Sequence, residues 1–285
     1  TQAGGDGDIT LTSNLGADAS TPGVTGVTRI GNTATADLNL NGTVYSTDGA
    51  TTFTALSNRT IDLGGSSPTF TTSADTITFG TADVDVANGT LTVNSVGGLI
   101  DFEGSILGTS DEVLVLNANA ATDGASANEK VIVAAIGTGN QIHSVSITGR
   151  DGITLEGNIT TSNKASNNVS FTGPVSINAA TVAIDTDATG NDGTVTFSST
   201  IDSASGTSRN LDIVSATGNV TVTGAIGATT ALASLDINQA GGDGDITLTS
   251  NIGADASNPG VTGVTRIGNT ATADLNLDGT VYTTG

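Results

Sequence analysis

Apolar and polar residues alternate in short stretches along this chain, and one pattern recurs. It consists of an apolar residue, a second two positions later and a third four positions beyond that. The pattern occurs at Ile9-Leu11-Leu15, Leu38-Leu40-Val44, Ile100-Phe102-Ile106, Ile153-Leu155-Ile159, Val169-Phe171-Val175, Val195-Phe197-Ile201, Val220-Val222-Ile226 and Ile246-Leu248-Ile252. Such alternation is the period-two signature of a β-strand with one buried face.

A second set of short strands is predicted ahead of several of these stretches. They are Leu91–Val93, Val145–Ile147, Leu211–Ile213 and Leu235–Ile237. Gly, Asn-Gly and Asp-Gly between the stretches supply the positive φ angles that turns require. The abundant threonine disfavours helix. The chain is therefore predicted to be all-β.

The spacing of the pattern predicts how the strands are arranged. From Val169 onward it restarts after 26, 25 and 26 residues. Because such short strands cannot each bury an apolar face, successive turns must stack, which predicts a parallel β-helix (β-solenoid) with rungs of roughly 25 residues. Residues 50–90 and 107–145 fit poorly and are expected to contain insertions or irregular turns. The alternative is an array of immunoglobulin-like β-sandwiches, which requires a sequence repeat of about the length of one such domain.

A much longer repeat encloses the short one. Residues 1–48 align with residues 238–285, and 42 of the 48 positions are identical. The differences are Thr1/Asn238, Leu15/Ile252, Thr21/Asn258, Asn41/Asp278, Ser46/Thr283 and Asp48/Gly285. We interpret residues 1–237 as one long β-solenoid repeat unit and 238–285 as the start of the next. Neither end resembles a specialised cap, so we expect the polypeptide or the fibre to continue in both directions.

Composition narrows the classes of partner. Acidic residues number 28 against 7 Lys and Arg, giving a formal charge of −21, which disfavours nucleic acid as a partner. No apolar run approaches the roughly 18 residues of a membrane-spanning helix. The absence of cysteine excludes disulfides and thiolate metal sites.

Two stretches raise the question of calcium. Gly-Gly-Asp-Gly-Asp at residues 4–8 resembles an RTX turn, but Ile9 stands where a carboxylate ligand is required, so we interpret it as an acidic turn. Residues 185–192 match the first half of an EF-hand-like loop, although Thr196 replaces the Glu at its twelfth position. Asp185, Asp187 and Asp192 are therefore the candidate metal ligands, with calcium as the one possible cofactor.

Candidate catalytic groups are few. Asp101 and Glu103 flank Phe102 and would share one face of a strand, as the acid and base of a β-helical polysaccharide-degrading enzyme could. The same positions are also the solvent-facing alternates of an ordinary strand, which is the interpretation we favour. His143 stands beside a predicted strand start and is interpreted as a surface or turn residue. The sequence thus favours a protein that is not an enzyme.

Residues 218–238, together with GDGDITLTSNIG at 242–253, resemble the long repetitive bacterial surface proteins related to filamentous haemagglutinin adhesins. The resemblance implies a right-handed parallel β-helix that is secreted and displayed as a fibre. The expected function is a non-catalytic repeat segment of an extracellular fibre or adhesin at a bacterial cell surface. Its expected partners are adjacent copies of itself, head to tail, and possible others are a host surface or extracellular matrix. Alternatives are a calcium-dependent cell-surface binding module, an S-layer or matrix protein, and a polysaccharide-degrading enzyme.

Overall fold

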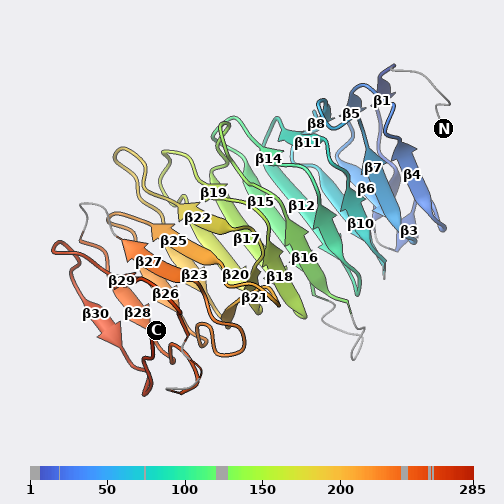
Figure 1. Ribbon diagram of the computed structural model, residues 1–285. Helices are drawn as coiled ribbons and strands as arrows, with labels where there is room; N and C mark the ends of the chain where they lie inside the picture. Colours follow the sequence, from blue (N-terminus) through green and yellow to red (C-terminus); the bar gives the residue numbers. More distant parts are fainter. Residues whose placement is uncertain are drawn as a thin grey trace. The chain divides into compact units, whose positions relative to one another are not determined.

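The computed structural model describes residues 7–18, 20–73, 75–119, 128–238, 243–255, 258 and 260–285. In these residues the regular elements are β-strands and there is no helix (Figure 1). The fold is a parallel β-solenoid of about 10 turns with rungs of about 25 residues. This confirms the predicted fold class. It also removes the immunoglobulin-like alternative, because the sheets of that fold are antiparallel.

The chain divides into two compact units. The first comprises Thr1–Ile142 and Ile147–Asp151, and the second comprises His143–Ser146 and Gly152–Gly285. Strand β17 (Ser144–Gly149) is shared between them. This division follows contacts in space, whereas the boundary expected at residue 237 follows the repeat in the sequence.

The first unit has three parallel sheets, each named here after its first strand. The β1 sheet contains β1 (Ile9–Leu11), β5 (Leu38–Leu40), β8 (Thr60–Leu63), β11 (Asp83–Val86) and β14 (Ile106–Leu107). The β4 sheet contains β4 (Thr28–Gly31), β7 (Thr51–Thr54), β10 (Ile77–Phe79), β13 (Ile100–Phe102) and β16 (Lys130–Val133). The β6 sheet contains β6 (Val44–Thr47), β9 (Thr69–Thr72), β12 (Thr90–Ser95) and β15 (Val113–Ala118). A small antiparallel pair, β2 (Gly16–Asp18) and β3 (Thr21–Pro22), stands beside them.

The second unit is built in the same way. The β18 sheet contains β18 (Gly152–Leu155), β21 (Val175–Ile177) and β24 (Ile201–Ser203). The β19 sheet contains β19 (Ile159–Thr160), β22 (Thr181–Asp185), β25 (Asn210–Val214), β27 (Ser234–Asn238) and β29 (Thr265–Ile267). The β20 sheet contains β20 (Val169–Thr172), β23 (Val195–Phe197), β26 (Val220–Val222), β28 (Ile246–Leu248) and β30 (Leu275–Leu277).

The 26-, 25- and 26-residue spacing found in the sequence matches the pairing of successive strands in the β20 sheet. Val169 lies opposite Val195, Val195 opposite Val220, and Val220 opposite Ile246. Each of these steps places an apolar residue directly on an apolar residue of the adjacent turn. The short repeat therefore predicted both the topology and the residue-by-residue pairing of this sheet.

The prediction of irregular turns within residues 50–90 is wrong. There, strands β7 to β12 pair with their neighbours in continuous parallel register. The corners in this segment have other lengths: Ile61 and Leu63 are followed by Phe70 on the next strand, so the apolar residues fall at other offsets. By contrast, residues 107–145 do contain a longer turn, since Ile100 pairs with Val131. Part of it, residues 120–127, lies outside the described residues.

The recurrent apolar pattern marks a corner between two sheets. Its first two residues lie on one strand, and its third begins the next strand of the turn or, at Leu15, Ile226 and Ile252, forms an isolated bridge to an adjacent turn. In the first unit it joins β5 of the β1 sheet to β6, and it also joins β13 of the β4 sheet to β14. In the second unit it joins β18 to β19 and β20 to β21. One local sequence therefore serves at more than one corner of a turn.

The core of each unit consists of apolar side chains stacked from turn to turn. In the first unit aromatic rings stack: Phe79 and Phe102 have centroids 4.3 Å apart and planes 7° apart, and Tyr45 stacks on Phe70 at 4.6 Å. The second unit has one such pair, Phe171 and Phe197, at 4.7 Å. Each fully buried Leu, Ile, Val or Phe stabilises the fold by roughly 1.5–3 kcal/mol relative to an exposed one. Stacking between turns is therefore what holds the solenoid together.

Candidate functional site

The three candidate calcium ligands lie at one corner of the second unit. Asp185 ends β22, and Asp187 and Asp192 are in the loop after it. The backbone N–H of Asp187 donates to Oδ1 of Asp185 at 3.0 Å, and that of Ala188 donates to Oδ1 of Asp192 at 3.3 Å. The other oxygen of Asp192 accepts hydrogen bonds from the N–H and the hydroxyl of Thr217, at 3.1 and 2.6 Å. The carboxylates thus shape the turn and connect it to the next one.

The pKa of Asp187 reflects the closely spaced carboxylates of this corner. Burial raises the pKa of Asp187, and the negative charges of Asp192 and Asp185 raise it further. Even so, among the described residues no group of three or more His, Cys, Asp or Glu side chains is arranged to hold a metal ion. The turn hydrogen bonds account for this constellation, and calcium at Asp185, Asp187 and Asp192 stays a prediction.

The RTX-like turn falls largely outside the described residues, which omit Gly4, Gly5 and Asp6 in the first copy and 239–242 in the second. Its described remainder makes contacts between turns. Oδ1 of Asp8 accepts a hydrogen bond from the N–H of Asp37 at 3.2 Å. The N–H of Asp245 donates to Oδ1 of Asn219 at 2.9 Å. These contacts fit the interpretation of an acidic turn.

The structure places no second carboxylate opposite the candidate catalytic residue Asp101 on the adjacent turns. Asp101 lies on β13 between Thr78 and Ile132 of the adjacent turns, so the positions above and below it are not carboxylates. Glu103 comes directly after the strand and is exposed. Nε2 of His143 lies 3.0 Å from the carbonyl oxygen of Ala165, at the surface.

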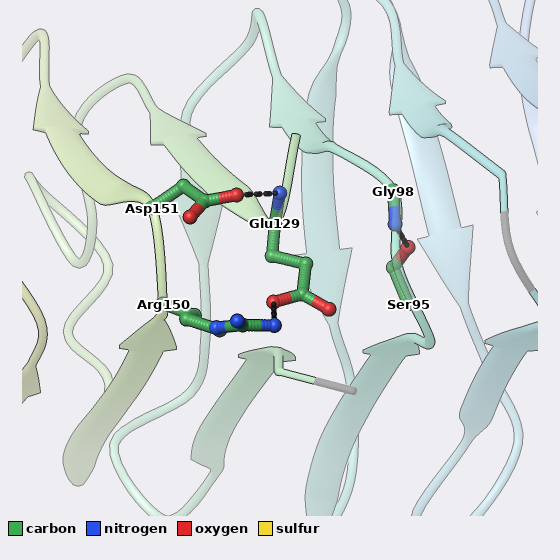
Figure 2. Close-up of polar contacts among 5 residues, drawn as sticks. All are labelled: Ser95, Gly98, Glu129, Arg150 and Asp151. Carbon is green, nitrogen blue, oxygen red and sulfur yellow. Dashed lines mark hydrogen bonds and ion pairs between the residues drawn. The ribbon is translucent and has the colours of Figure 1, made fainter. Parts of the chain in front are cut away.

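One polar cluster of the first unit was missed by sequence reasoning. The Glu129 side chain is 0% exposed and its Oε2 lies 3.0 Å from Nη1 of Arg150. Oδ2 of Asp151 accepts a hydrogen bond from the N–H of Glu129 at 3.0 Å, and Figure 2 shows Arg150 and Asp151 meeting Glu129 from the adjacent turn. A buried carboxylate requires such a partner. The signal in the sequence was the separation of Glu129 from Arg150, close to one turn.

Other buried polar groups also serve corners. Oγ of Ser95 accepts a hydrogen bond from the N–H of Gly98 at 3.0 Å (Figure 2) and donates to the carbonyl of Asp75 at 2.9 Å. Burial alone would raise the pKa of Glu112, but hydrogen bonds from the hydroxyl and N–H of Thr109, each at 2.6 Å, hold it below its ordinary value. These groups are occupied in structural contacts.

The strongest candidate for a binding surface is the end of the second unit. Here β29 and β30 are the last strands of their sheets (Figure 1). With residues 281–284 they form a surface that we call the C-terminal end face. Leu275, Leu277 and Tyr282 on it are 46%, 43% and 38% exposed. A hollow lined by Ile267, Gly268, Asn269, Thr270, Thr272, Ala273 and Leu275 lies on the same surface.

Exposure of this kind is unusual for such residues. Their counterparts in the first copy of the repeat, Leu38, Leu40 and Tyr45, are 0%, 0% and 2% exposed. Apolar side chains gathered on the open edge of a sheet, with unpaired backbone groups beside them, are a template for another strand. The end face can therefore add a further turn by backbone pairing and apolar stacking.

Comparisons with known proteins returned no matching family model, no matching curated protein and no matching solved structure. No described segment forms a helix with the length and apolar character needed to cross a membrane.

Proposed function

We propose that this chain is a non-catalytic structural protein, a repeat segment of an extracellular surface fibre or adhesin whose turns continue end to end as a rod. One observation carries the proposal. The same segment of sequence folds in the same way at both ends of the long repeat. Leu38, Leu40 and Tyr45 are buried where another turn is added, and their counterparts Leu275, Leu277 and Tyr282 are exposed at the C-terminal end face.

Three further features support this role. The sequence resembles the filamentous haemagglutinin-like surface proteins, whose repeats are displayed as fibres at the bacterial cell surface. The formal charge of −21 favours solubility and repels parallel fibres from one another. The polar groups at the corners are engaged in holding the turns, as a structural role requires. The partner is another copy of the repeat, with a host surface or extracellular matrix as the external target.

The test is a chain that carries a second complete copy of residues 1–237 ahead of the present sequence. If the turns continue at about 4.8 Å each, we expect particles of unchanged width that are longer by about 45 Å in electron microscopy. A matched control places a flexible Gly-Ser linker at the junction and should give two separate bodies at variable angles. The proposal is contradicted if the longer chain forms separate globules without the linker.

A further inference from the structure

The C-terminal end face has a counterpart of nearly the same sequence inside the first unit. Residues 265–284 correspond to residues 28–47, and they differ only where Asn41 becomes Asp278 and Ser46 becomes Thr283. Within the first unit a further turn covers this counterpart. The first unit therefore shows what the exposed residues contact when a turn is added.

The two copies fold alike, which makes the comparison direct. Ile9 lies opposite Leu38, as Ile246 lies opposite Leu275. The N–H of Gly42 donates to the hydroxyl of Tyr45 at 2.8 Å, and the N–H of Gly279 donates to that of Tyr282 at 2.6 Å.

The side-chain anchors of the turns agree as well. Oδ1 of Asn14 accepts from the N–H of Thr43 at 2.7 Å, and Oδ1 of Asn251 accepts from that of Thr280 at 2.9 Å. The local structure is thus set by the sequence of the segment, and the end face presents the same groups as its counterpart.

In the first unit the added turn is formed by residues 49–72. Strand β7 pairs with β4, β8 with β5, and β9 with β6. Leu38 lies opposite Ile61 and Tyr45 opposite Phe70. The rings of Tyr45 and Phe70 stack at 4.6 Å, and Phe53 meets Tyr45 edge-on at 6.2 Å.

The same turn also forms backbone hydrogen bonds with residues 28–47. The N–H of Thr28 donates to the carbonyl of Ala50 at 2.9 Å, and the N–H of Thr69 donates to that of Thr43 at 2.9 Å. The N–H of Gly64 donates to the carbonyl of Leu40 at 3.1 Å.

We propose that the C-terminal end face binds, as its next turn, a segment with the sequence of residues 49–72 from a further copy of the repeat, placed directly after position 285. In this arrangement Thr265 lies opposite the counterpart of Thr51, Leu275 opposite that of Ile61, and Tyr282 opposite that of Phe70. The inference rests on the proposed function, because it assigns the contact through which the rod lengthens.

Three differences between the copies bear on this fit. Asn41 is exposed, so Asp at position 278 meets solvent. Ser46 is fully buried, and Thr283 must place one additional methyl group there. The hydroxyl of Ser73 donates to Asp48 in the first unit, and this contact has no counterpart at Gly285. Because Ser73 lies just beyond the 49–72 segment, the segment itself keeps its other contacts.

The experiment is to extend the 285-residue chain by the 24 residues GATTFTALSNRTIDLGGSSPTFTT and to measure hydrogen exchange over residues 265–284. We expect exchange in this segment to slow by at least about tenfold relative to the unextended chain, since pairing closes its open edge. The matched control is the same extension in which the added counterparts of Phe53, Ile61 and Phe70 are replaced by Ser, while the original residues are unchanged. This control keeps the length but removes the added stacking residues. It should leave exchange as in the unextended chain.

Equal exchange in the extended chain and its control overturns the proposal, because the stacking residues then have no effect. That outcome is distinguishable from failure of the proposed function. If the two-unit chain lengthens while the short extension leaves residues 265–284 unprotected, the fibre role stands and the assigned register is wrong. If the two-unit chain forms separate bodies while the extension is protected, the contact stands and the fibre role fails.

Discussion

The two copies of the 48-residue segment have almost the same sequence and share the hydrogen bonds of Tyr45/Tyr282 and Asn14/Asn251, yet they differ in burial. Leu38, Leu40 and Tyr45 are enclosed, whereas Leu275 and Leu277 are exposed. The difference lies in the neighbouring turn, because strands β7, β8 and β9 cover the first copy and none of the described strands covers the second. Local sequence therefore determines the shape of a turn, and the adjacent turn determines how much that turn contributes to stability.

The largest expected difference in the free energy of unfolding is between two leucine truncations, one in each copy. Leu40→Ala opens a cavity between turns and should lower the free energy of unfolding by about 2–5 kcal/mol. Leu277→Ala, at the corresponding place in the second copy, should cost less than about 1 kcal/mol because the side chain is already partly in water. Urea unfolding of both variants measures the two losses. Equal losses would mean that burial by the next turn is not what separates the copies.

Removal of a tyrosine hydroxyl makes a finer comparison. Tyr45→Phe leaves the buried N–H of Gly42 without its acceptor, which should cost about 1–3 kcal/mol. In Tyr282→Phe water can replace the lost acceptor of Gly279, so the cost should stay below about 0.5 kcal/mol. Thermal unfolding of the two variants in parallel gives both values. A Tyr282→Phe loss as large as that of Tyr45→Phe would show that the second copy is covered in solution.

A pH test examines Asp185, Asp212 and Asp236, which lie on the adjacent strands β22, β25 and β27. Burial raises the pKa of Asp212 above 3.8, and the charges of Asp236 and Asp185 add to the effect. The folded state thus binds the proton more tightly than the unfolded state, so stability is greater at low pH and falls as pH rises through the raised pKa.

Asp212→Asn should therefore gain roughly 0.2–1 kcal/mol at pH 7 and nothing at about pH 3, measured by thermal unfolding at both values. Asp278→Asn, which restores the residue found at Asn41 in the first copy, is the matched control and should change little. A gain for Asp212→Asn that persists at low pH would argue against a charge effect.

The last test concerns the arginine shared by both copies, whose expected effect disappears at high salt. Arg266 lies 3.1 Å from Asp236, whereas its counterpart Arg29 lies opposite Thr52. Because the Arg266 side chain is 68% exposed, water and salt screen the pair, and Arg266→Gln should cost only about 0.2–1 kcal/mol at low salt and nearly nothing at high salt. Arg29→Gln should show no comparable salt dependence. Unfolding of both variants at two ionic strengths distinguishes these outcomes.

The sequence predicted the fold well where corners repeat at constant length. The steps of Val169, Val195, Val220 and Ile246 gave the true pairing, because stacked turns require equivalent apolar residues at equal intervals. Residues 50–90 were misjudged because their corners differ in length while the stacking is unchanged. Variation in a turn shifts the positions of apolar residues along the chain without moving them in space.

The site was harder to predict than the fold. The pairing of Glu129 with Arg150 joins residues of adjacent turns and leaves no local motif. The aspartates at 185, 187 and 192 do form a local motif, yet hydrogen bonds within their own turn and to Thr217 account for it. Nor does the sequence distinguish Leu38 from Leu275, because a residue's exposure depends on which turn lies next to it.

The corner pattern has a consequence for how such chains can change length. Since the same seven-residue pattern forms corners at more than one edge of a coil, a duplicated or deleted stretch need not contain whole coils to remain compatible with its surroundings. We expect that genetic exchange between similar corners can add or remove fractions of a coil and still yield a folded product. Length would then be an easily varied trait of this molecule.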